Sequence, residues 1–353
     1  MGLPKKSGFD LHAKWPSGRR NLITDVKGVK VGHVTINKGD IHSGVTAVIP
    51  QPGNLFKNKV MAGVSVINGF GKSAGLIQIQ EMGTIETPII LTNTLSVGTG
   101  AQALVRYMLK DNEDIGVTTG TVNPIVMECN DGGLSDIRGL HIKEKHIMDA
   151  INNCAITFEE GAVGGGTGMS CLGVKGGIGS ASKVVKNSAG EFTIGALVMS
   201  NFGSPGNLVI GGKHYDTRKC SQAVTEDEKK EEKKDKGSVI MIIATDAPLN
   251  ERQLGRVSKR ALAALARVGS YSGNSSGDIA VAFTTANRVP HYSKKLVLDT
   301  KMYFDTEIDE IFEASVEAVE EALVSSLYHA KTMVGIRGKK KYGLLDFIKE
   351  FGE

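Results

Sequence analysis

A small hydroxyl residue stands where two very different stretches of the chain meet. Residues Thr225 to Lys236 are almost entirely charged, whereas the run from Ser238 to Ala244 is apolar and is typical of a buried β-strand. If the Gly237–Ser238 bond were cut, Ser238 would become a new N-terminus at the head of a rigid element. Its free α-amine could then act as the base for its own hydroxyl, which activates a weak nucleophile. The alternative is a solvated loop followed by an ordinary strand-start residue, because charge runs are commonly just solvated.

Two further places in the sequence put polar side chains at the ends of predicted strands. Ser276 and Asp278 lie one residue apart where a loop leads into the strand predicted for Ile279 to Thr285, so they could share a hydroxyl–carboxylate hydrogen bond. Asn201 follows the alternating strand Phe192 to Ser200. A side-chain amide in this place can donate to a developing oxyanion, although most such asparagines only cap turns.

A loop rich in carboxylates follows another predicted strand, Val122 to Met127. It begins at Glu128 and continues as Cys129-Asn130-Asp131-Gly132-Gly133-Leu134-Ser135-Asp136. Carboxylates beside glycines at a strand end are one form of small-molecule site. They are equally typical of Asx turns.

Glycines are densest between Glu160 and Ser180. Such a stretch can leave backbone N–H groups pointing at an anion or oxyanion, or it can form tight turns between packed strands. The tripeptide Gly71-Lys72-Ser73 suggests a phosphate loop, but Val66 stands where that motif needs its first glycine, so a nucleotide site is not expected.

Periodicity predicts strands alternating with helices over most of the chain. The remaining strands are expected as a pair within Asn21–Thr35 and at Gly44–Pro50, Val60–Asn68 and Pro88–Thr92. Helices are expected at Ser73–Met82, Gly98–Leu109, Lys143–Asn153, Asn250–Val268 and Thr306–Met333. Asn250 is a natural N-cap for the fourth of these.

The composition limits the class of protein. The chain has 353 residues, 41% of them apolar and 23% charged, which is ordinary for a globular α/β protein of one large or two ordinary domains. No basic stripe interleaved with aromatics is visible, so nucleic acid is not an expected partner. The four cysteines and eight histidines lack zinc-ligand spacing and a disulfide framework. Without a secretory signal or a membrane-spanning run, we expect a reduced, cytoplasmic compartment.

Five segments, in this order, resemble the self-processing serine aminopeptidases of the DmpA/BapA type, the P1 or DOM-fold family. They are the loop ECNDGGLSDI, the stretch EGAVGGGTGMSCLGVKGGIGS, the segment ALVMSNFG, the Gly237–Ser238 junction and SGDIAVAFTTAN. The resemblance runs from about Asn21 to about Val289. It implies an α+β fold, a four-layer αββα sandwich like that of the N-terminal-nucleophile hydrolases. One domain over residues 1–353 would be cut into chains 1–237 and 238–353.

The resemblance also assigns roles to residues. Ser238 would be the nucleophile, first on the Gly237 carbonyl and then on substrate, and Ser276 and Asp278 would orient Ser238 and its new α-amine. Asn201 would stabilise the oxyanion, and Glu128 would bind the free amino group of a small peptide, amide or ester. The chemistry implies no metal or organic cofactor, and relatives assemble as homo-oligomers, tetramers of processed pairs.

Two other functions stay open on the same fold. One is N-acyl transfer of the ornithine-acetyltransferase type, although those enzymes cut before Thr and this chain has Ser. The other is an unprocessed, non-catalytic relative, against which the joint presence of Ser238, Ser276, Asp278 and Asn201 argues. Some family members place a tyrosine in the loop after Glu128, and this chain has no aromatic residue there.

Overall fold

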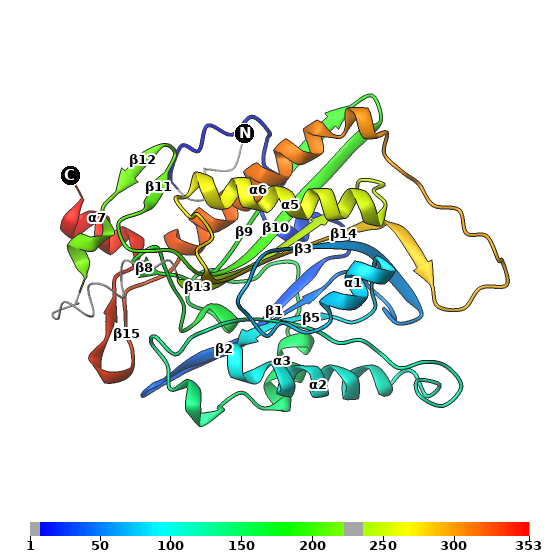
Figure 1. The fold of residues 1–353 in the computed structure, drawn as a ribbon, viewed down its shortest axis with the longest axis horizontal. Coiled ribbons are helices and arrows are strands. Elements are labelled where there is room, and N and C mark those ends of the chain that lie inside the picture. The colour runs from blue at the N-terminus through cyan, green and yellow to red at the C-terminus, as the bar shows by residue number, and fades with distance from the viewer. Residues whose placement is uncertain (1–7, 222–235, 353) are drawn as a thin grey trace.

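A computed structural model describes residues 8–221 and 236–352, and within them the strands form two large facing sheets (Figure 1). The smaller sheet has the strand order β1 (Lys30–Lys38), β2 (Ile41–Ile49), β5 (Ile89–Asn93) and β6 (Ile125–Cys129). The larger has the order β4 (Thr84–Ile85), β3 (Asn58–Gly69), β14 (Ser275–Pro290), β13 (Lys236–Thr245), β10 (Gly190–Asn201) and β9 (Ile178–Asn187). The charged stretch before Ser238 lies outside the described residues, apart from the start of β13.

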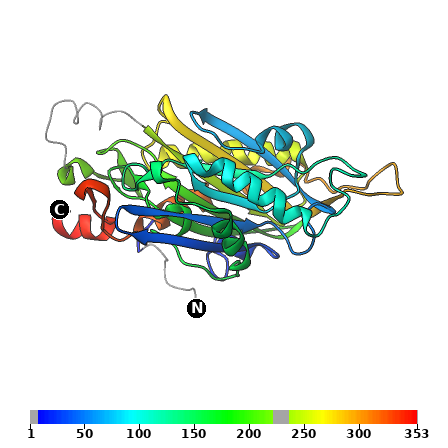
Figure 2. The ribbon, with the colours of Figure 1, turned by 90° about the horizontal axis from the view of Figure 1, so that it is seen from below.

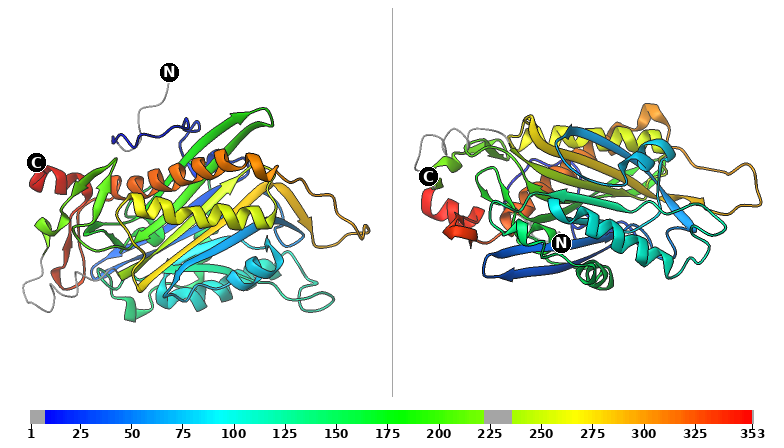
Figure 3. Two further views of the ribbon diagram at one scale, coloured as in Figure 1. Left: turned by 45° about the horizontal axis from the view of Figure 1, so that its top comes forward. Right: turned by 60° about the horizontal axis from the view of Figure 1, so that its bottom comes forward.

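Helices cover the outer face of each sheet. The helices are α1 (Leu76–Met82), α2 (Val97–Leu109), α3 (Glu144–Asn152), α5 (Glu251–Arg267), α6 (Asp309–Tyr328) and α7 (Leu344–Phe351). Figure 3 shows α5 and α6 side by side over the large sheet, and Figure 2 shows α2 and α3 on the small one. The layers therefore run helix, sheet, sheet, helix, and the αββα expectation is confirmed.

Short ribbons complete the fold. They are β7 (Ser170–Cys171) with β8 (Val174–Lys175), β11 (Leu208–Ile210) with β12 (Lys213–Tyr215), and β15 (Met333–Val334) with β16 (Lys340–Lys341). Three-residue 3₁₀ turns occur at Ile23–Asp25 (η1) and Gly164–Gly166 (η4), among others.

Three apolar layers hold these elements together. The central layer lies between the sheets and includes Met127, Cys129, Leu197 and Ile240. A second layer packs the large sheet against α5 and α6, and a third packs the small sheet against α2 and α3. Strand β13 is buried on both faces, since Val239 and Met241 belong to the helix side and Ile240 and Ile242 to the central layer. This explains its continuous apolar sequence.

Most predicted elements are present, with shifted ends. Asn250 caps α5, where its side chain accepts a hydrogen bond from the Gln253 N–H at 2.9 Å. The strand pair expected within residues 21–35 is wrong, because only β1 forms there and its partner is β2. Before β1, the Asp25 carboxylate accepts hydrogen bonds from the main-chain N–H groups of Arg20 and Leu22, and this local bonding replaces a strand ladder.

Helix α6 is shorter and more buried than its pattern suggests. It ends at Tyr328, and the next residues turn to pair Met333–Val334 with β16. Three of its glutamates are buried, and each has a partner. Glu317 accepts from the main-chain N–H groups of Lys14 and Trp15, Glu320 pairs with Arg267 at 2.8 Å, and Glu321 pairs with Lys183 at 2.7 Å. A carboxylate can be buried in a protein interior when a cation or hydrogen-bond donors pair with it.

Candidate active site

Ser238 is buried near the start of β13, at one end of the large sheet. It is 3% exposed, and its ladder partners are Asn201 in the antiparallel β10 and Gly277 in the parallel β14. Its hydroxyl oxygen has no hydrogen-bond partner among the described residues. A buried hydroxyl without a partner carries a desolvation cost and so lowers the stability of the fold. This favours a role for Ser238 in a reaction over a role in stabilising the fold.

Asn201 projects from the same face of the sheet as Ser238, because directly paired strand residues share a face. Its side-chain Oδ1 accepts a hydrogen bond from the Ser170 N–H at 3.0 Å, and its Nδ2 donates to the Asn130 carbonyl at 3.0 Å. The amide is therefore held between the glycine-rich stretch and the loop after β6. Its NH₂ group carries a second N–H.

Ser276 and Asp278 form the predicted pair. The Ser276 hydroxyl donates to Asp278 Oδ1 at 2.5 Å, and both residues are fully buried. In the ladder, Ser276 is paired with Gly237 and Asp278 with Val239, so they lie beside the main chain on either side of Ser238. Their side chains project from the face opposite to the Ser238 hydroxyl. The structure thus brings the pair to the Ser238 backbone and not to its side-chain oxygen.

Gly237 occupies a position that only glycine fits. Its φ is +118°, and a Cβ added there would lie 1.9 Å from the Asn201 carbonyl oxygen. Any other residue would have to move β10 or leave the left-handed backbone region. Gly277 also lacks a side chain beside Ser238, where a Cβ would come 2.6 Å from the Phe70 carbonyl oxygen. The backbone is therefore packed closely on both sides of the nucleophile candidate.

Glu128 lies at the end of β6 and is 4% exposed. Its Oε1 accepts from the Lys72 N–H at 2.8 Å, and its Oε2 accepts from the Thr94 hydroxyl. The Lys72 N–H belongs to the Gly71-Lys72-Ser73 segment, so these residues orient a carboxylate rather than a phosphate. Sequence reasoning missed Lys72 and Thr94, since neither lies near Glu128 in the chain.

The loop after Glu128 also contains the expected Asx turn, in which the Asn130 side chain accepts from the Gly132 N–H at 2.9 Å. The Asx-turn alternative is therefore confirmed at Asn130, and substrate binding by Glu128 stays a prediction. The pKa of Asp131 is raised to about 6, because the effect of burial outweighs the opposing effect of the nearby side chains of Ser43 and Asn93.

Cys129 links the two sheets directly beneath the nucleophile candidate. Its Sγ lies 3.4 Å from the Ser238 carbonyl oxygen and 3.6 Å from that of Met199. Burial raises the pKa of this thiol well above its usual range. Cys129 is thus a protonated donor to the Ser238 main chain, a role for which the sequence had given no signal.

The glycine-rich stretch forms tight turns, one of its two predicted alternatives. The N–H of Gly165 donates to the Thr46 hydroxyl, that of Gly166 to the Val163 carbonyl and that of Gly177 to the Ser200 hydroxyl. These N–H groups are occupied inside the protein. The part of this stretch that reaches the candidate site is the N–H of Ser170, through Asn201.

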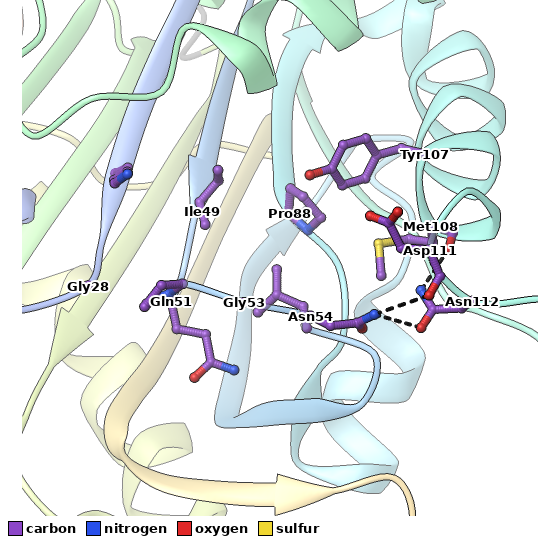
Figure 4. Close-up of a pocket in the computed structure, with 13 residues that line it drawn as sticks. Gly28, Ile49, Gln51, Gly53, Asn54, Pro88, Tyr107, Met108, Asp111 and Asn112 are labelled. Carbon is purple, nitrogen blue, oxygen red and sulfur yellow. Dashed lines mark hydrogen bonds between the residues drawn. The ribbon is translucent and has the colours of Figure 1, made fainter.

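A separate pocket of about 270 Å³ lies between the loop after β2 and the end of α2 (Figure 4). Gln51, Asn54, Tyr107 and Asp111 are among its lining residues, and none of the candidate catalytic residues lines it. In the described ranges, no group of three His, Cys, Asp or Glu residues could hold a metal ion. Nor does any helix there have the length and apolarity needed to cross a bilayer.

A serine, an amide and a hydroxyl–carboxylate pair at one strand end of an αββα sandwich are the groups expected in a hydrolase of the serine peptidase class. The chain belongs to peptidase family S58, whose model matches residues 21–341. This extends the resemblance seen in the sequence past Val289 and into α6 and the ribbon that follows.

Known relatives agree with this assignment. The chain is 37% identical to the β-peptidyl aminopeptidase BapA of Sphingosinicella microcystinivorans, over 91% of this chain and 84% of that protein. A solved protein of Pyrococcus horikoshii is 51% identical, with a TM-score of 0.89 and coverage of 96% and 95% of the two chains. The L-aminopeptidase D-Ala-esterase/amidase of Ochrobactrum anthropi is 35% identical, with a TM-score of 0.86 and coverage of 96% and 94%.

The Ochrobactrum structure is described as a prototype for the serine aminopeptidases and a new variant of the N-terminal-nucleophile hydrolase fold. The expectation of a hydrolase of the serine aminopeptidase class is confirmed by this family membership and these relatives.

Proposed function

We propose that this chain is a self-processing aminopeptidase that cuts its own Gly237–Ser238 bond and then uses Ser238 as an N-terminal nucleophile. The products would be chains 1–237 and 238–353, which stay together as one αββα domain. The observation that carries the proposal is the packing around Ser238. A buried serine, whose hydroxyl has no hydrogen-bond partner in the part of the chain that the structure describes, lies between Asn201 on one strand and Gly277 on the other, with Ser276 and Asp278 on either side of Gly277.

The self-cleavage step needs only groups of the chain and one water molecule. The Ser238 hydroxyl attacks the Gly237 carbonyl carbon, the peptide C–N bond breaks, and an ester forms while the Ser238 nitrogen leaves as an amine. Water then hydrolyses the ester, which returns the hydroxyl and leaves a carboxylate on Gly237. The glycine supports this step because no side chain blocks the approach to its carbonyl, and its φ of +118° sets it apart from ordinary strand backbone.

In the peptidase reaction, the new α-amine takes the proton of the Ser238 hydroxyl as the oxygen attacks the substrate carbonyl. The second N–H of the Asn201 amide donates to the oxyanion that develops. The proton passes to the leaving amine, and an acyl-enzyme on Ser238 is then hydrolysed by water. The Ser276–Asp278 pair lies beside the Ser238 main chain, where it would hold the α-amine that cleavage creates.

Glu128 would make the enzyme an aminopeptidase. Its carboxylate is fixed by the Lys72 N–H and the Thr94 hydroxyl, and a charged hydrogen bond to a substrate ammonium would be stronger than a neutral one. The substrate class is therefore a small peptide, amide or ester with a free N-terminal amine. The Sphingosinicella relative is a β-peptidyl aminopeptidase and the Ochrobactrum relative is an L-aminopeptidase D-Ala-esterase/amidase, and both activities fall within this class.

The test is an assay with a matched pair of chromogenic amides, one with a free α-amine and one N-acetylated. We expect turnover of the first only, and loss of that turnover in Ser238→Ala. A matched control is Ser258→Ala in α5, a fully buried serine whose hydroxyl donates to the Gly255 carbonyl of the same helix. Full activity in Ser238→Ala would overturn the proposal. Transfer of the acyl group to an added amine without hydrolysis would instead favour the acyltransferase alternative.

Two further parts of the proposal concern assembly and location. Processed pairs would associate as a homo-oligomer, which light scattering of the purified protein would test. The four cysteines are free thiols in the structure, which agrees with a cytoplasmic location where thiols stay reduced.

A further inference from the structure

Lys175 is a fully buried lysine whose surroundings differ from those of the other buried lysines. Lys59 and Lys183 each pair with a glutamate, at 3.3 Å and 2.7 Å. Lys175 is 0% exposed and has no carboxylate within ion-pair distance among the described residues. Burial lowers the pKa of its ammonium to about 7. An unpaired cation in a protein interior is costly, so its presence calls for a role.

The Lys175 ammonium holds together the turns of the glycine-rich stretch. Its Nζ donates to the carbonyl oxygens of Met169 and Gly176 at 2.8 Å and to that of Gly166 at 3.2 Å. An ammonium has three N–H donors, and all three acceptors lie within residues 166–176. Lys175 therefore cross-links this segment from inside.

The segment that Lys175 closes is bound to the end of β10. Ser170, the ladder partner of Lys175, donates its N–H to Asn201 Oδ1 at 3.0 Å. Gly177, two residues beyond Lys175, exchanges hydrogen bonds with Ser200: its N–H donates to the hydroxyl, and its carbonyl accepts from the Ser200 N–H at 2.9 Å. The segment is thus hydrogen-bonded to both Ser200 and Asn201 at the end of β10, and to Asn201 through its side-chain amide.

The hydrogen bond from the Ser170 N–H determines whether the oxygen or the NH₂ group of the Asn201 amide faces the candidate site. With Oδ1 on Ser170, the NH₂ group is directed to Asn130 and to the side of the sheet that Ser238 shares. If the amide turned over, its NH₂ would face the Ser170 N–H, donor against donor. The position of the Ser170 N–H depends on the turns that Lys175 cross-links.

We infer that Lys175 is a positioning residue that fixes the Asn201 amide for oxyanion stabilisation through the segment 166–176. This rests on the proposed function, in which Asn201 donates to the oxyanion. Lys175 acts through the turns of segment 166–176 and the Asn201 amide, and it touches no substrate atom. Its loss should therefore weaken the transition-state contact while leaving substrate binding at Glu128 as it was.

The test is a double-mutant cycle of Lys175→Met and Asn201→Ala, with kcat expressed per processed chain as quantified by mass spectrometry. Methionine keeps the unbranched side chain as far as Cε and removes Nζ with its donors. We expect Lys175→Met to lower kcat about tenfold or more with KM within about twofold, since small misplacements of a catalytic group are costly. In the Asn201→Ala background, Lys175→Met should change kcat little, because coupled residues are not additive.

Two variants complete the design. Lys183→Met removes another buried lysine, one bonded to Glu321 rather than to the turns, and should leave kcat per folded, processed chain unchanged. If Lys175→Met does not fold, Lys175→Gln replaces it, because its amide still donates two hydrogen bonds. Lys175→Gln should still lower kcat relative to the wild type, but by less than the roughly tenfold expected for the loss of all three donors.

The outcomes separate the two levels of the proposal. If Asn201→Ala leaves kcat unchanged, the oxyanion role itself fails. If Asn201→Ala lowers kcat but Lys175→Met and Lys175→Gln do not, or if their effects add fully to that of Asn201→Ala, the inference about Lys175 alone is overturned.

Discussion

Asn201 and Ser238 are direct partners in the β10–β13 ladder, and their side chains project from the same face of the large sheet. Two main-chain groups hold the Asn201 amide, the Ser170 N–H and the Asn130 carbonyl, each at 3.0 Å. A donor held in this way needs no reorganisation when charge develops beside it, which is the physical basis of oxyanion stabilisation.

Replacing this donor should slow chemistry and not binding. We expect Asn201→Ala to lower kcat by about a hundred- to thousandfold, as loss of one oxyanion donor does elsewhere, with little change in KM. Steady-state kinetics on a free-amine amide measures both constants. Asn187→Ala, which removes an amide at the far end of the β9–β10 pair, is the control and should retain full kcat. A rise in KM at constant kcat would place Asn201 in substrate binding instead.

Glu128 should set the preference for a free amino group. Glu128→Gln keeps the shape of the side chain and its contact with the Lys72 N–H, but it removes the charge that would face a substrate ammonium. A hydrogen bond to a charged group contributes about 1.5–3 kcal/mol, so kcat/KM should fall by roughly ten- to a hundredfold. The comparison with an N-acetylated amide is decisive: the wild-type preference for the free amine should shrink in the variant. An unchanged preference would remove Glu128 from amine recognition.

Gly237 should be required for self-cleavage on steric grounds. Gly237→Ala would place a Cβ 1.9 Å from the Asn201 carbonyl oxygen at a φ of +118°, so the residue-237 carbonyl would shift relative to the Ser238 hydroxyl that attacks it. We expect uncut precursor to accumulate, which gel electrophoresis detects. Gly255→Ala in α5 is the matched control, since a Cβ there meets nothing within 4 Å. Normal processing of Gly237→Ala would contradict the steric argument.

Asp131 should make stability fall as the pH rises through the weakly acidic range. Burial raises the pKa of this carboxyl from 3.8 to about 6, so between these values the folded state binds a proton that the unfolded state has lost. Stability is therefore greatest below about pH 4 for this group and declines towards pH 6. A difference of about two pKa units corresponds to about 3 kcal/mol at most.

The measurement is urea unfolding of the Ser238→Ala chain, expected to remain whole, at several pH values from 4 to 7. The added substitution Asp131→Asn should raise the free energy of unfolding relative to its parent, by an amount that grows between pH 4 and pH 6. The exposed carboxylate of Asp40 offers the control, and Asp40→Asn should show no such trend. A difference independent of pH would mean that Asp131 does not titrate in this range.

Much of the fold could be predicted because the apolar pattern and the local geometry agree. The residues after Ser238 are apolar on both faces, and β13 is indeed one of the two central strands of the large sheet, covered on both faces. Ser276 and Asp278 could be paired from the sequence because only Gly277 separates them on one strand, and alternate residues of a strand share a face. Asn250 was identifiable as a cap from its place before an amphipathic run.

What the sequence did not reveal depends on contacts between distant segments. Thr94 and Lys72 reach Glu128 from other parts of the chain, and Cys129 reaches Ser238 across the space between the two sheets. The need for a glycine at position 237 arises only once β10 and β13 are paired, because a Cβ there would lie 1.9 Å from the Asn201 carbonyl oxygen. The role of Lys175 could not be predicted, because its three carbonyl acceptors come together only in the folded turns.

The central claim, self-cleavage before Ser238, is tested most directly by the intact mass of freshly purified protein under denaturing conditions. The account predicts two species, with the masses of chains 1–237 and 238–353, and a single full-length species for Ser238→Ala. A single full-length mass for the wild-type protein, in a preparation that turns over a free-amine amide, would contradict it. Ser238 would then lack the α-amine that the mechanism requires.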